Sequence, residues 1–302
     1  RRLWFLDRLE SGVEGRSSGE PSSGSGTYLI PIAIRLTGSL DRTALECALN
    51  DLVGRHESLR TVFPETGGVP RQEVLRAPTA QLKLEITSVT EDALAEALST
   101  AAARSFDLSH ELPLRAHLLA IESVSQTTEH VLLLVLHHIA GDGWSLRPLL
   151  RDLGAFYQAR LEGGAAALPA LSVQYADYTL WQRDVLGEEA KADSAIGRQL
   201  SYWKEALRDL PEQIELPADR ARPAVSSHRG GHVPIRIDAA LHQQLASLSR
   251  STGASLFMVL QAGLSALLSR LGAGTDIALG SPIAGRGDAA LDELIGFFVN
   301  TL

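Results

Sequence analysis

Segments with the apolar spacing of strands alternate along the chain with segments that have the spacing of helices. Successive side chains of a strand point to opposite faces, whereas apolar residues three or four positions apart share one face of a helix. These patterns predict strands at residues 28–36, 59–63, 82–89, 114–121, 130–136, 232–237 and 277–279. They predict helices after the N-cap residue Asp41, from a first turn containing Pro148 to residue 161, and at residues 91–104, 172–186, 194–207, 239–251 and 255–271. Mixed strands and helices in two halves predict an α/β or α+β protein with two lobes.

The best boundary between the lobes is the segment GGAAALPAL at residues 163–171, which is rich in Gly, Ala and Pro and has no apolar periodicity. We therefore expect an N-terminal lobe at residues 1–170 and a C-terminal lobe at residues 171–302. Residues 12–26 are rich in Gly and Ser, a composition typical of a flexible loop. The first residue is Arg, the only methionine is Met258, and the chain stops directly after an apolar run, so we interpret it as part of a longer protein.

Composition and charge exclude several classes of partner. Of 302 residues, 45% are hydrophobic and 21% are charged, which is typical of a globular protein with a large core. The 28 Lys and Arg residues against 36 Asp and Glu residues give a net charge of -8, which disfavours nucleic acid and anionic membranes as partners. The longest apolar run, residues 131–136, is far shorter than the roughly 20 residues of a membrane span, and residues 1–10 lack a signal-peptide stretch. We expect a cytoplasmic protein.

The single cysteine, Cys47, excludes an intrachain disulfide and a multi-cysteine metal site. It lies among Leu45, Ala48, Leu49 and Leu52 at helical spacing. This pattern favours a small buried apolar residue over a reactive thiol.

The strongest chemical signal is HHIAGDGWS at residues 137–145, directly after the predicted strand 130–136. Because neighbouring side chains of a strand point to opposite faces, only one of His137 and His138 can line a given cavity, while the other packs behind it. The pattern HHxxxDG arises by chance in roughly one chain of this composition in a thousand. An ordinary pair of strand-end histidines is one alternative. A zinc site is disfavoured, because adjacent histidines diverge and neither HExxH nor a cysteine set is present.

The rest of this segment has the residue types of a tight turn that leads into a helix. Gly141 and Gly143 permit a close turn with positive φ, and Ser145 is suited to cap the next helix. The candidate catalytic groups therefore lie at a strand end.

Five ordered segments of the chain resemble the motifs of condensation domains of nonribosomal peptide synthetases. They are RLWFL at residues 2–6, RHESLRTVF at residues 55–63, the signature at residues 137–145, YADYTLW at residues 175–181 and IGFFVNT at residues 295–301. The resemblance implies the two-lobed chloramphenicol-acetyltransferase-like fold, of the α/β (α+β) class. The start of the first motif and everything after the fifth are missing, so it also implies a truncated second lobe whose sheet lacks later strands.

The resemblance also implies the chemistry, with His138, His137, Asp142 and Gly143 as candidate catalytic residues. The amine of an acceptor aminoacyl-carrier attacks the carbonyl of a donor aminoacyl- or peptidyl-carrier thioester. His138, the second histidine, acts on that amine as a general base or as a positioning group, since a neutral imidazole can accept a proton near pH 7. We expect Gly143 to offer its backbone N–H to the developing oxyanion and His137 to act mainly through packing.

The remaining residues of the signature are expected to support the site. By resemblance, Asp142 points away from the cavity and forms a buried, bidentate pair with Arg286 of the second lobe. Trp144 is expected to pack under the loop, and Ser145 to cap the helix. No metal ligands are predicted.

Two other segments favour structural roles. His56 and Glu57 are interpreted as a polar turn with salt bridges in preference to an acid–base couple. Tyr175, Tyr178 and Trp181 share one helical face, and we favour core or lobe packing over stacking on a substrate.

The implied partners are donor and acceptor peptidyl carrier domains, with an adenylation domain in the same polypeptide. Substrates arrive on phosphopantetheine, and no tightly bound cofactor is expected. Heterocyclisation domains have paired aspartates in place of the histidines, and inactive relatives lose the second histidine. Epimerisation domains keep the signature but differ at the counterparts of residues 281–286 and 295–301, so peptide-bond formation is favoured. The open alternatives are an epimerisation domain, a stand-alone acyl-coenzyme A-dependent acyltransferase and a non-catalytic carrier-docking module.

Overall fold

Two compact units make up the chain in the computed structural model, which describes residues 2–13, 26–122, 129–211, 213–223 and 230–302. The first unit consists of residues 1–185 and 283–300, and the second of residues 186–282 and 301–302. The predicted division after residue 170 therefore differs from this grouping. The reason is that α5 (Tyr175–Leu186) packs through its tyrosines against Leu291, Leu294 and Phe298. The loop expected at residues 12–26 lies almost wholly outside the described residues.

The first unit is built on a four-stranded sheet with the strand order β1-β8-β7-β6. Its strands are β1 (Leu29–Thr37), β6 (Leu84–Thr90), β7 (Leu114–Glu122) and β8 (Glu129–His137). β8 is antiparallel to both of its neighbours, whereas β6 is parallel to β7. The four corresponding strands predicted from the sequence are confirmed.

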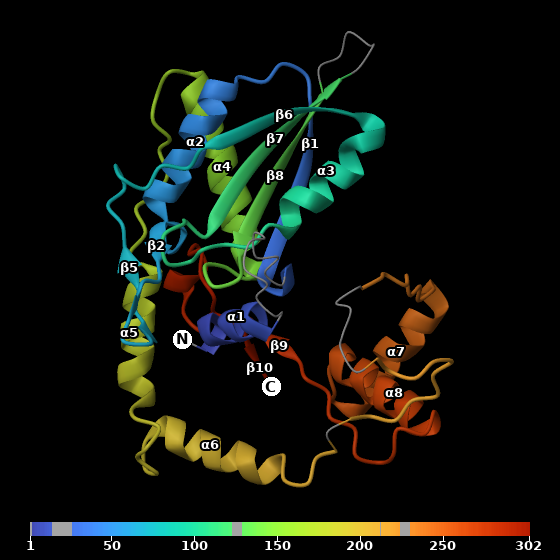
Figure 1. Cartoon of the computed structure of the whole chain (residues 1–302). Helices are drawn as coiled ribbons and strands as arrows, with labels where there is room; N and C mark the ends of the chain where they lie inside the picture. Colours follow the sequence, from blue (N-terminus) through green and yellow to red (C-terminus); the bar gives the residue numbers. More distant parts are fainter. Residues whose placement is uncertain (1, 14–25, 123–128, 212, 224–229) are drawn as a thin grey trace. The chain divides into compact units, whose positions relative to one another are not determined.

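Helices cover both faces of this sheet (Figure 1). Helices α2 (Arg42–Arg55) and α4 (Leu146–Leu161) pack on one face, and α3 (Glu91–Ala103) packs on the other. The start of α2 is fixed by Asp41, whose carboxylate accepts a hydrogen bond of 2.9 Å from the N–H of Ala44. The three helices predicted for this part of the chain are confirmed.

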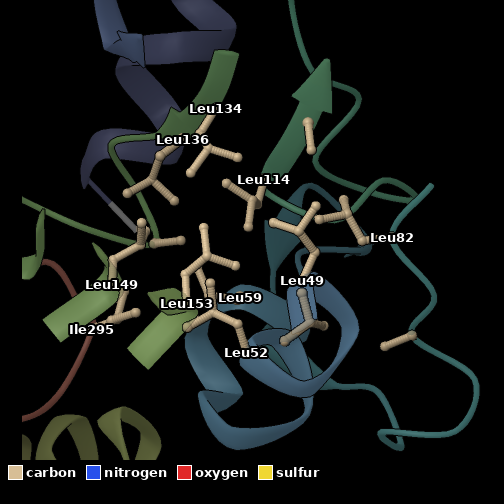
Figure 2. Packing of buried hydrophobic residues seen from close by; sticks show 14 of the residues in the cluster. Leu49, Leu52, Leu59, Leu82, Leu114, Leu134, Leu136, Leu149, Leu153 and Ile295 are labelled. Carbon is tan, nitrogen blue, oxygen red and sulfur yellow. The ribbon is translucent and has the colours of Figure 1, made fainter. Parts of the chain in front are cut away.

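β8 lies at the centre of the core because helices cover it on both sides. Its even-numbered residues from Leu132 to Leu136 pack in the cluster that includes residues of α2 and α4. Figure 2 shows Leu134 and Leu136 near leucines of both helices. Its odd-numbered residues from Val131 to Val135 face α3. Full burial of one such side chain contributes roughly 1.5–3 kcal/mol. The strand therefore holds the residues that follow it, His138 onward, in a fixed place.

The remaining elements of the first unit are short or peripheral. They are α1 (Arg2–Val13), η1 (Gly26–Tyr28), η2 (Glu57–Arg60), β2 (Thr61–Val62), β3 (Glu65–Thr66), β4 (Val69–Pro70), β5 (Glu73–Val74), η3 (Gly143–Ser145), and η4 (Ala289–Leu291). β2 pairs with β5 and β3 with β4. The strand predicted at residues 59–63 is therefore only partly right, because its first half is a 3-10 turn.

The second unit contains three helices, α6 (Ala195–Ala206), α7 (Ala239–Thr252) and α8 (Leu256–Arg270). Two short strands pair with each other at the positions where the chain changes unit, β9 (Pro282–Ile283) and β10 (Asn300–Thr301). The strands predicted at residues 232–237 and 277–279 are wrong, because neither segment pairs with a strand among the residues that the structure describes. Val233 and Ile235 are accordingly 86% and 87% exposed.

Two further sequence expectations concern exposure and length. Cys47 is half-buried, so it is less buried than the sequence predicted. Within the described part of the chain, no single helix is long and apolar enough to span a membrane; α7 and α8 pass that test only as a pair bent by 105°.

Candidate active site

The signature segment forms the turn between β8 and α4. β8 ends at His137, and after a turn Asp142 caps η3 with a reciprocal pair of hydrogen bonds to Ser145. The Asp142 carboxylate accepts from the Ser145 N–H at 3.0 Å, and the Ser145 hydroxyl oxygen accepts from the Asp142 N–H at 3.2 Å. Neither Gly141 nor Gly143 has the positive φ that we expected. Gly141 is instead required by proximity, because a Cβ there would lie 2.5 Å from the Leu136 side chain.

His137 is buried and bound at both ring nitrogens. Its Nδ1 accepts a hydrogen bond of 3.1 Å from the N–H of Ile139, so the ring proton of the neutral form sits on Nε2, which lies 3.3 Å from a carboxylate oxygen of Asp7. The ring also meets Phe106 edge-to-face, with centroids 5.9 Å apart. This histidine ties the signature turn to α1.

His138 has different surroundings. Its ring is half-buried and meets Phe297 edge-to-face, with centroids 5.2 Å apart and planes at 86°. Its Nδ1 is buried and has no hydrogen-bond partner among the described residues. The two adjacent imidazoles thus contact different elements, and no described carboxylate is bound to Nδ1 of His138.

Asp142 is fully buried, and its carboxylate is saturated with hydrogen bonds. One oxygen lies 3.0 Å from the Ser145 N–H, 2.9 Å from the Ser145 hydroxyl and 3.4 Å from Nη2 of Arg286. The other oxygen accepts from the N–H groups of Phe298 and Val299 at 2.9 and 3.1 Å. The predicted pairing partner is therefore in place, but the prediction of a bidentate pair is wrong.

The geometry of Arg286 explains this difference. Its Nη1 donates to the backbone carbonyls of Leu291 and Leu294, the latter at 2.9 Å, and its guanidinium lies 4.1 Å from the ring centroid of Phe298. Nη2 alone approaches Asp142, at 3.4 Å, and Ser145, at 3.1 Å, while Nε is buried and has no partner among the described residues. Arg286 belongs to the first compact unit, although the sequence placed it in the second lobe.

Side chains of the first unit hold the backbone of residues 295–297 at several successive positions. The Ser58 hydroxyl donates to the carbonyl of Ile295 at 2.7 Å, and the Tyr175 hydroxyl donates to the carbonyl of Phe297 at 2.8 Å. The Ser145 hydroxyl lies 2.9 Å from the carbonyl oxygen of Gly296 and accepts from its N–H at 3.1 Å. We missed these roles of Ser58 and Tyr175 in the sequence.

Gly296 is required by the packing of this segment. A Cβ at that position would lie 2.3 Å from a ring carbon of Tyr175 and 2.8 Å from one of Phe298. Burial raises the pKa of Tyr175, so its hydroxyl stays protonated and able to donate. The two tyrosines and Phe298 form a cluster, which agrees with the packing role predicted for Tyr175 and Tyr178.

The second motif forms a buried polar cluster. Nε2 of His56 lies 2.9 Å from the carboxylate of Asp152, which also accepts hydrogen bonds from Arg55 and Arg151. Burial lowers the pKa of His56. Burial opposes the charged form of Asp152 as well, but hydrogen bonds from His56 and Arg151 outweigh it and keep the pKa of Asp152 below its ordinary value. Glu57 forms a salt bridge of 3.2 Å with Arg60, as the interpretation as a polar turn predicts.

Trp144 and Gly143 are the exposed residues of the signature. Trp144 is 47% exposed, so the prediction that it packs under the loop is wrong. Open space surrounds the position that a Cβ of Gly143 would take. Among the described residues, no three His, Cys, Asp or Glu side chains gather closely enough to hold a metal ion.

Residues 20–302 match the family model of the condensation domain. The chain belongs to the condensation-domain family. Over its whole length it is 52% identical to a dimodular nonribosomal peptide synthase of Bacillus subtilis. It is 48% identical to an isonitrile lipopeptide synthase of Mycobacterium tuberculosis, and it spans 12% of each of these two relatives.

Solved structures agree with this assignment. The X-domain from teicoplanin biosynthesis matches all of this condensation domain with a TM-score of 0.85 and 36% identity, over 62% of the X-domain chain. The first condensation domain of the CDA synthetase matches with a TM-score of 0.68 over 67% of that chain, and its 20% identity supports the fold alone. The predicted chloramphenicol-acetyltransferase-like α+β fold is confirmed. Truncation of the second lobe stays a prediction.

Proposed function

We propose that this condensation domain forms a peptide bond between two carrier-bound substrates. Condensation domains are acyltransferases as a class, and this chain keeps both histidines of the signature. The observation that carries the proposal is the contrast between the two rings. His137 is buried and bound at both ring nitrogens, whereas the ring of His138 is half-buried and therefore partly accessible, with a buried Nδ1 that has no partner among the described residues. His138 is therefore the imidazole that remains able to act on a substrate.

In the proposed reaction, the amine of the acceptor aminoacyl group attacks the carbonyl of the donor thioester. A C–N bond forms, the C–S bond breaks, the donor's phosphopantetheine leaves as a thiol, and the amine loses one proton. His138 receives that proton or accepts a hydrogen bond that aims the amine. Holding both tethered reactants together supplies much of the remaining acceleration.

Two neighbouring groups have separate roles in this proposal. In this proposal the backbone N–H of Gly143, an exposed residue, donates to the developing oxyanion. Asp142 does not take part in proton transfer, because its two oxygens already accept hydrogen bonds from Ser145, Phe298 and Val299. Its part is to hold the turn.

The proposed partners are donor and acceptor peptidyl carrier domains whose phosphopantetheine arms bring the substrates. An adenylation domain in the same polypeptide loads one of them, and no tightly bound cofactor is needed. The relative from Bacillus subtilis is a dimodular nonribosomal peptide synthase, which supports this setting. The cytoplasmic location expected from the sequence stays a prediction.

The proposal is tested by comparing two acyl donors. The domain is mixed with an aminoacyl-loaded acceptor carrier and either a loaded donor carrier or the same acyl group on coenzyme A, and carrier-bound products are weighed by mass spectrometry. We expect the dipeptidyl product with the donor carrier alone. Product from acyl-coenzyme A instead would indicate a stand-alone acyltransferase. Inversion of the donor residue without condensation would indicate an epimerisation domain, and carrier binding without any product would indicate a docking module.

A further inference from the structure

We propose that Phe297 is the positioning residue of His138, and that Asp142, Ser145 and Tyr175 influence the reaction through it. The inference rests on the proposed function of His138. It assigns a role to an aromatic side chain that lies 159 positions further along the chain than the histidine it serves.

The His138 ring lacks a hydrogen bond to any described residue at its buried nitrogen, Nδ1. In a histidine with a fixed orientation, one ring nitrogen is usually tied to a carbonyl, a carboxylate or a backbone N–H, which also selects the tautomer. His137 has this arrangement with Ile139 and Asp7. Nδ1 of His138 is buried and has no partner of this kind in the described part of the chain. Nδ1 therefore does not fix the ring, and in this proposal its packing does.

The ring of His138 packs against the ring of Phe297. The ring contact found for His138 is with Phe297, at a centroid distance of 5.2 Å and an interplanar angle of 86°. An edge-to-face pair of this geometry is attractive and directional, so rotation of the imidazole out of it is opposed. The neighbouring ring, Phe298, faces the tyrosines and Arg286 instead. The two successive phenylalanines thus contact different residues: Phe297 packs on His138, and Phe298 packs on the tyrosines and Arg286.

Phe297 is itself held in place. Its carbonyl accepts the hydrogen bond from Tyr175, and its two chain neighbours are bound by Ser145 at Gly296 and by Asp142 at Phe298. Three successive residues therefore have backbone groups fixed by side chains of the first unit. Asp142 therefore influences the orientation of His138 indirectly. It holds the backbone next to Phe297 and does not contact the imidazole.

The consequence for catalysis follows from geometry. Misplacement of a reacting group by about 1 Å can lower a rate by on the order of 100-fold. Phe297→Leu keeps an apolar side chain but removes the aromatic face or edge that orients the imidazole. We expect turnover at saturating carrier concentration to fall by on the order of 10-fold to 100-fold, with KM changed by less than about twofold.

The test has a spectroscopic readout that does not depend on activity. The whole 302-residue chain is prepared with 15N- and 13C-labelled histidine, and the His138 signals are identified by their loss in His138→Gln. We expect a nuclear Overhauser effect between the rings of His138 and Phe297 in the native chain. In Phe297→Leu we expect the His138 signals to shift or broaden as the ring samples other orientations.

The matched control is Phe106→Leu, which removes the edge-to-face partner of the other histidine. We expect it to move the signals of His137 and leave those of His138 in place. If Phe297→Leu leaves the His138 signals and the turnover unchanged, the inference is overturned. Should that variant not fold, the absence of the nuclear Overhauser effect between His138 and Phe297 in the native chain overturns it equally.

The two proposals fail in different ways. If the native chain makes no dipeptidyl product but its His138 signals respond to Phe297→Leu, the proposed function is wrong and the positioning contact stands. If the native chain makes product and neither signals nor turnover respond to the substitution, the positioning role is wrong and the proposed function stands.

Discussion

The side chain of Ser145 and the backbone of Gly296 are joined in both directions although 151 positions separate them. The hydroxyl lies 2.9 Å from the carbonyl oxygen of Gly296 and accepts from its N–H at 3.1 Å. Both groups are buried, so neither can exchange its partner for water. The signature turn and the fifth motif are therefore parts of one structure.

Ser145→Ala is expected to destabilise the protein by about 1–3 kcal/mol, because it leaves the buried N–H and C=O of Gly296 without this partner. Chemical denaturation measures the free energy of unfolding. Ser172→Ala, at an exposed serine, is the control and should change it by less than about 0.5 kcal/mol. Equal stability of the two variants would contradict the contact.

Gly296→Ala is expected to destabilise the protein by about 1–3 kcal/mol, since the new methyl group would overlap the ring of Tyr175. Gly154→Ala is the matched control. It lies exposed within α4 with open space around it, so the same change should stabilise by up to about 1 kcal/mol. A thermal-shift comparison of the two variants decides the question, and a native-like Gly296→Ala would refute the close packing.

Asp142→Ala and Arg286→Ala are expected to couple in a double-mutant cycle. Asp142→Ala leaves buried N–H groups and Arg286 without their carboxylate, which should lower the free energy of unfolding by about 3–5 kcal/mol. The double variant should lose less than the sum of the single variants by about 0.5–3 kcal/mol. The control cycle pairs Asp142→Ala with Arg160→Ala, whose guanidinium binds Asp51 at the surface and shares no partner with Asp142. That cycle should be additive, and additivity in the first cycle as well would count against the pairing.

Much of the first unit could be predicted from the sequence, because its signals are local. The residue pattern at 130–136 indicated a strand, and Asp41 indicated the start of α2. The resemblance gave Arg286 as the partner of Asp142. The unpaired segment 232–237 was misread, because alternation predicts a strand without showing whether a neighbouring strand exists.

The contacts that were missed are those between distant residues. Ser58 binds Ile295 across 237 positions, and nothing in the local pattern around a serine indicates a partner so far away. The edge-to-face contact of Phe297 with His138 likewise joins residues far apart in the sequence, and no local pattern indicates it. The exposure of Trp144 was missed because tryptophan side chains are highly buried on average, and the sequence does not show whether a given one is an exception.

The free energy of unfolding is expected to fall as the pH drops below about 6.5, the ordinary pKa of histidine. Burial lowers the pKa of His56 in the folded protein, and the hydrogen bond to Asp152 opposes this only in part, while Arg55 and Arg151 add to the lowering. The unfolded chain therefore binds a proton at a higher pH than the folded chain, so acid favours unfolding.

His56→Gln keeps a donor for Asp152 and cannot titrate, so it should flatten this part of the pH profile. His117 and His130 keep some of the slope, because burial lowers their pKa values too. His110→Gln, at an exposed histidine, is the control. Denaturation at several pH values between 5 and 8 gives the slopes. Identical slopes for the His56→Gln and native chains would show that this histidine is not linked to unfolding.

The most direct measurement is the single-turnover rate of dipeptidyl-carrier formation by the native, His138→Ala and His137→Ala proteins. We expect His138→Ala to keep its circular dichroism spectrum but to lose on the order of 10²- to 10⁴-fold in rate. We expect His137→Ala mainly to lose stability, because that ring is bound to Ile139 and Asp7. Product formed by His138→Ala at the native rate would contradict the central claim that this imidazole acts on the amine.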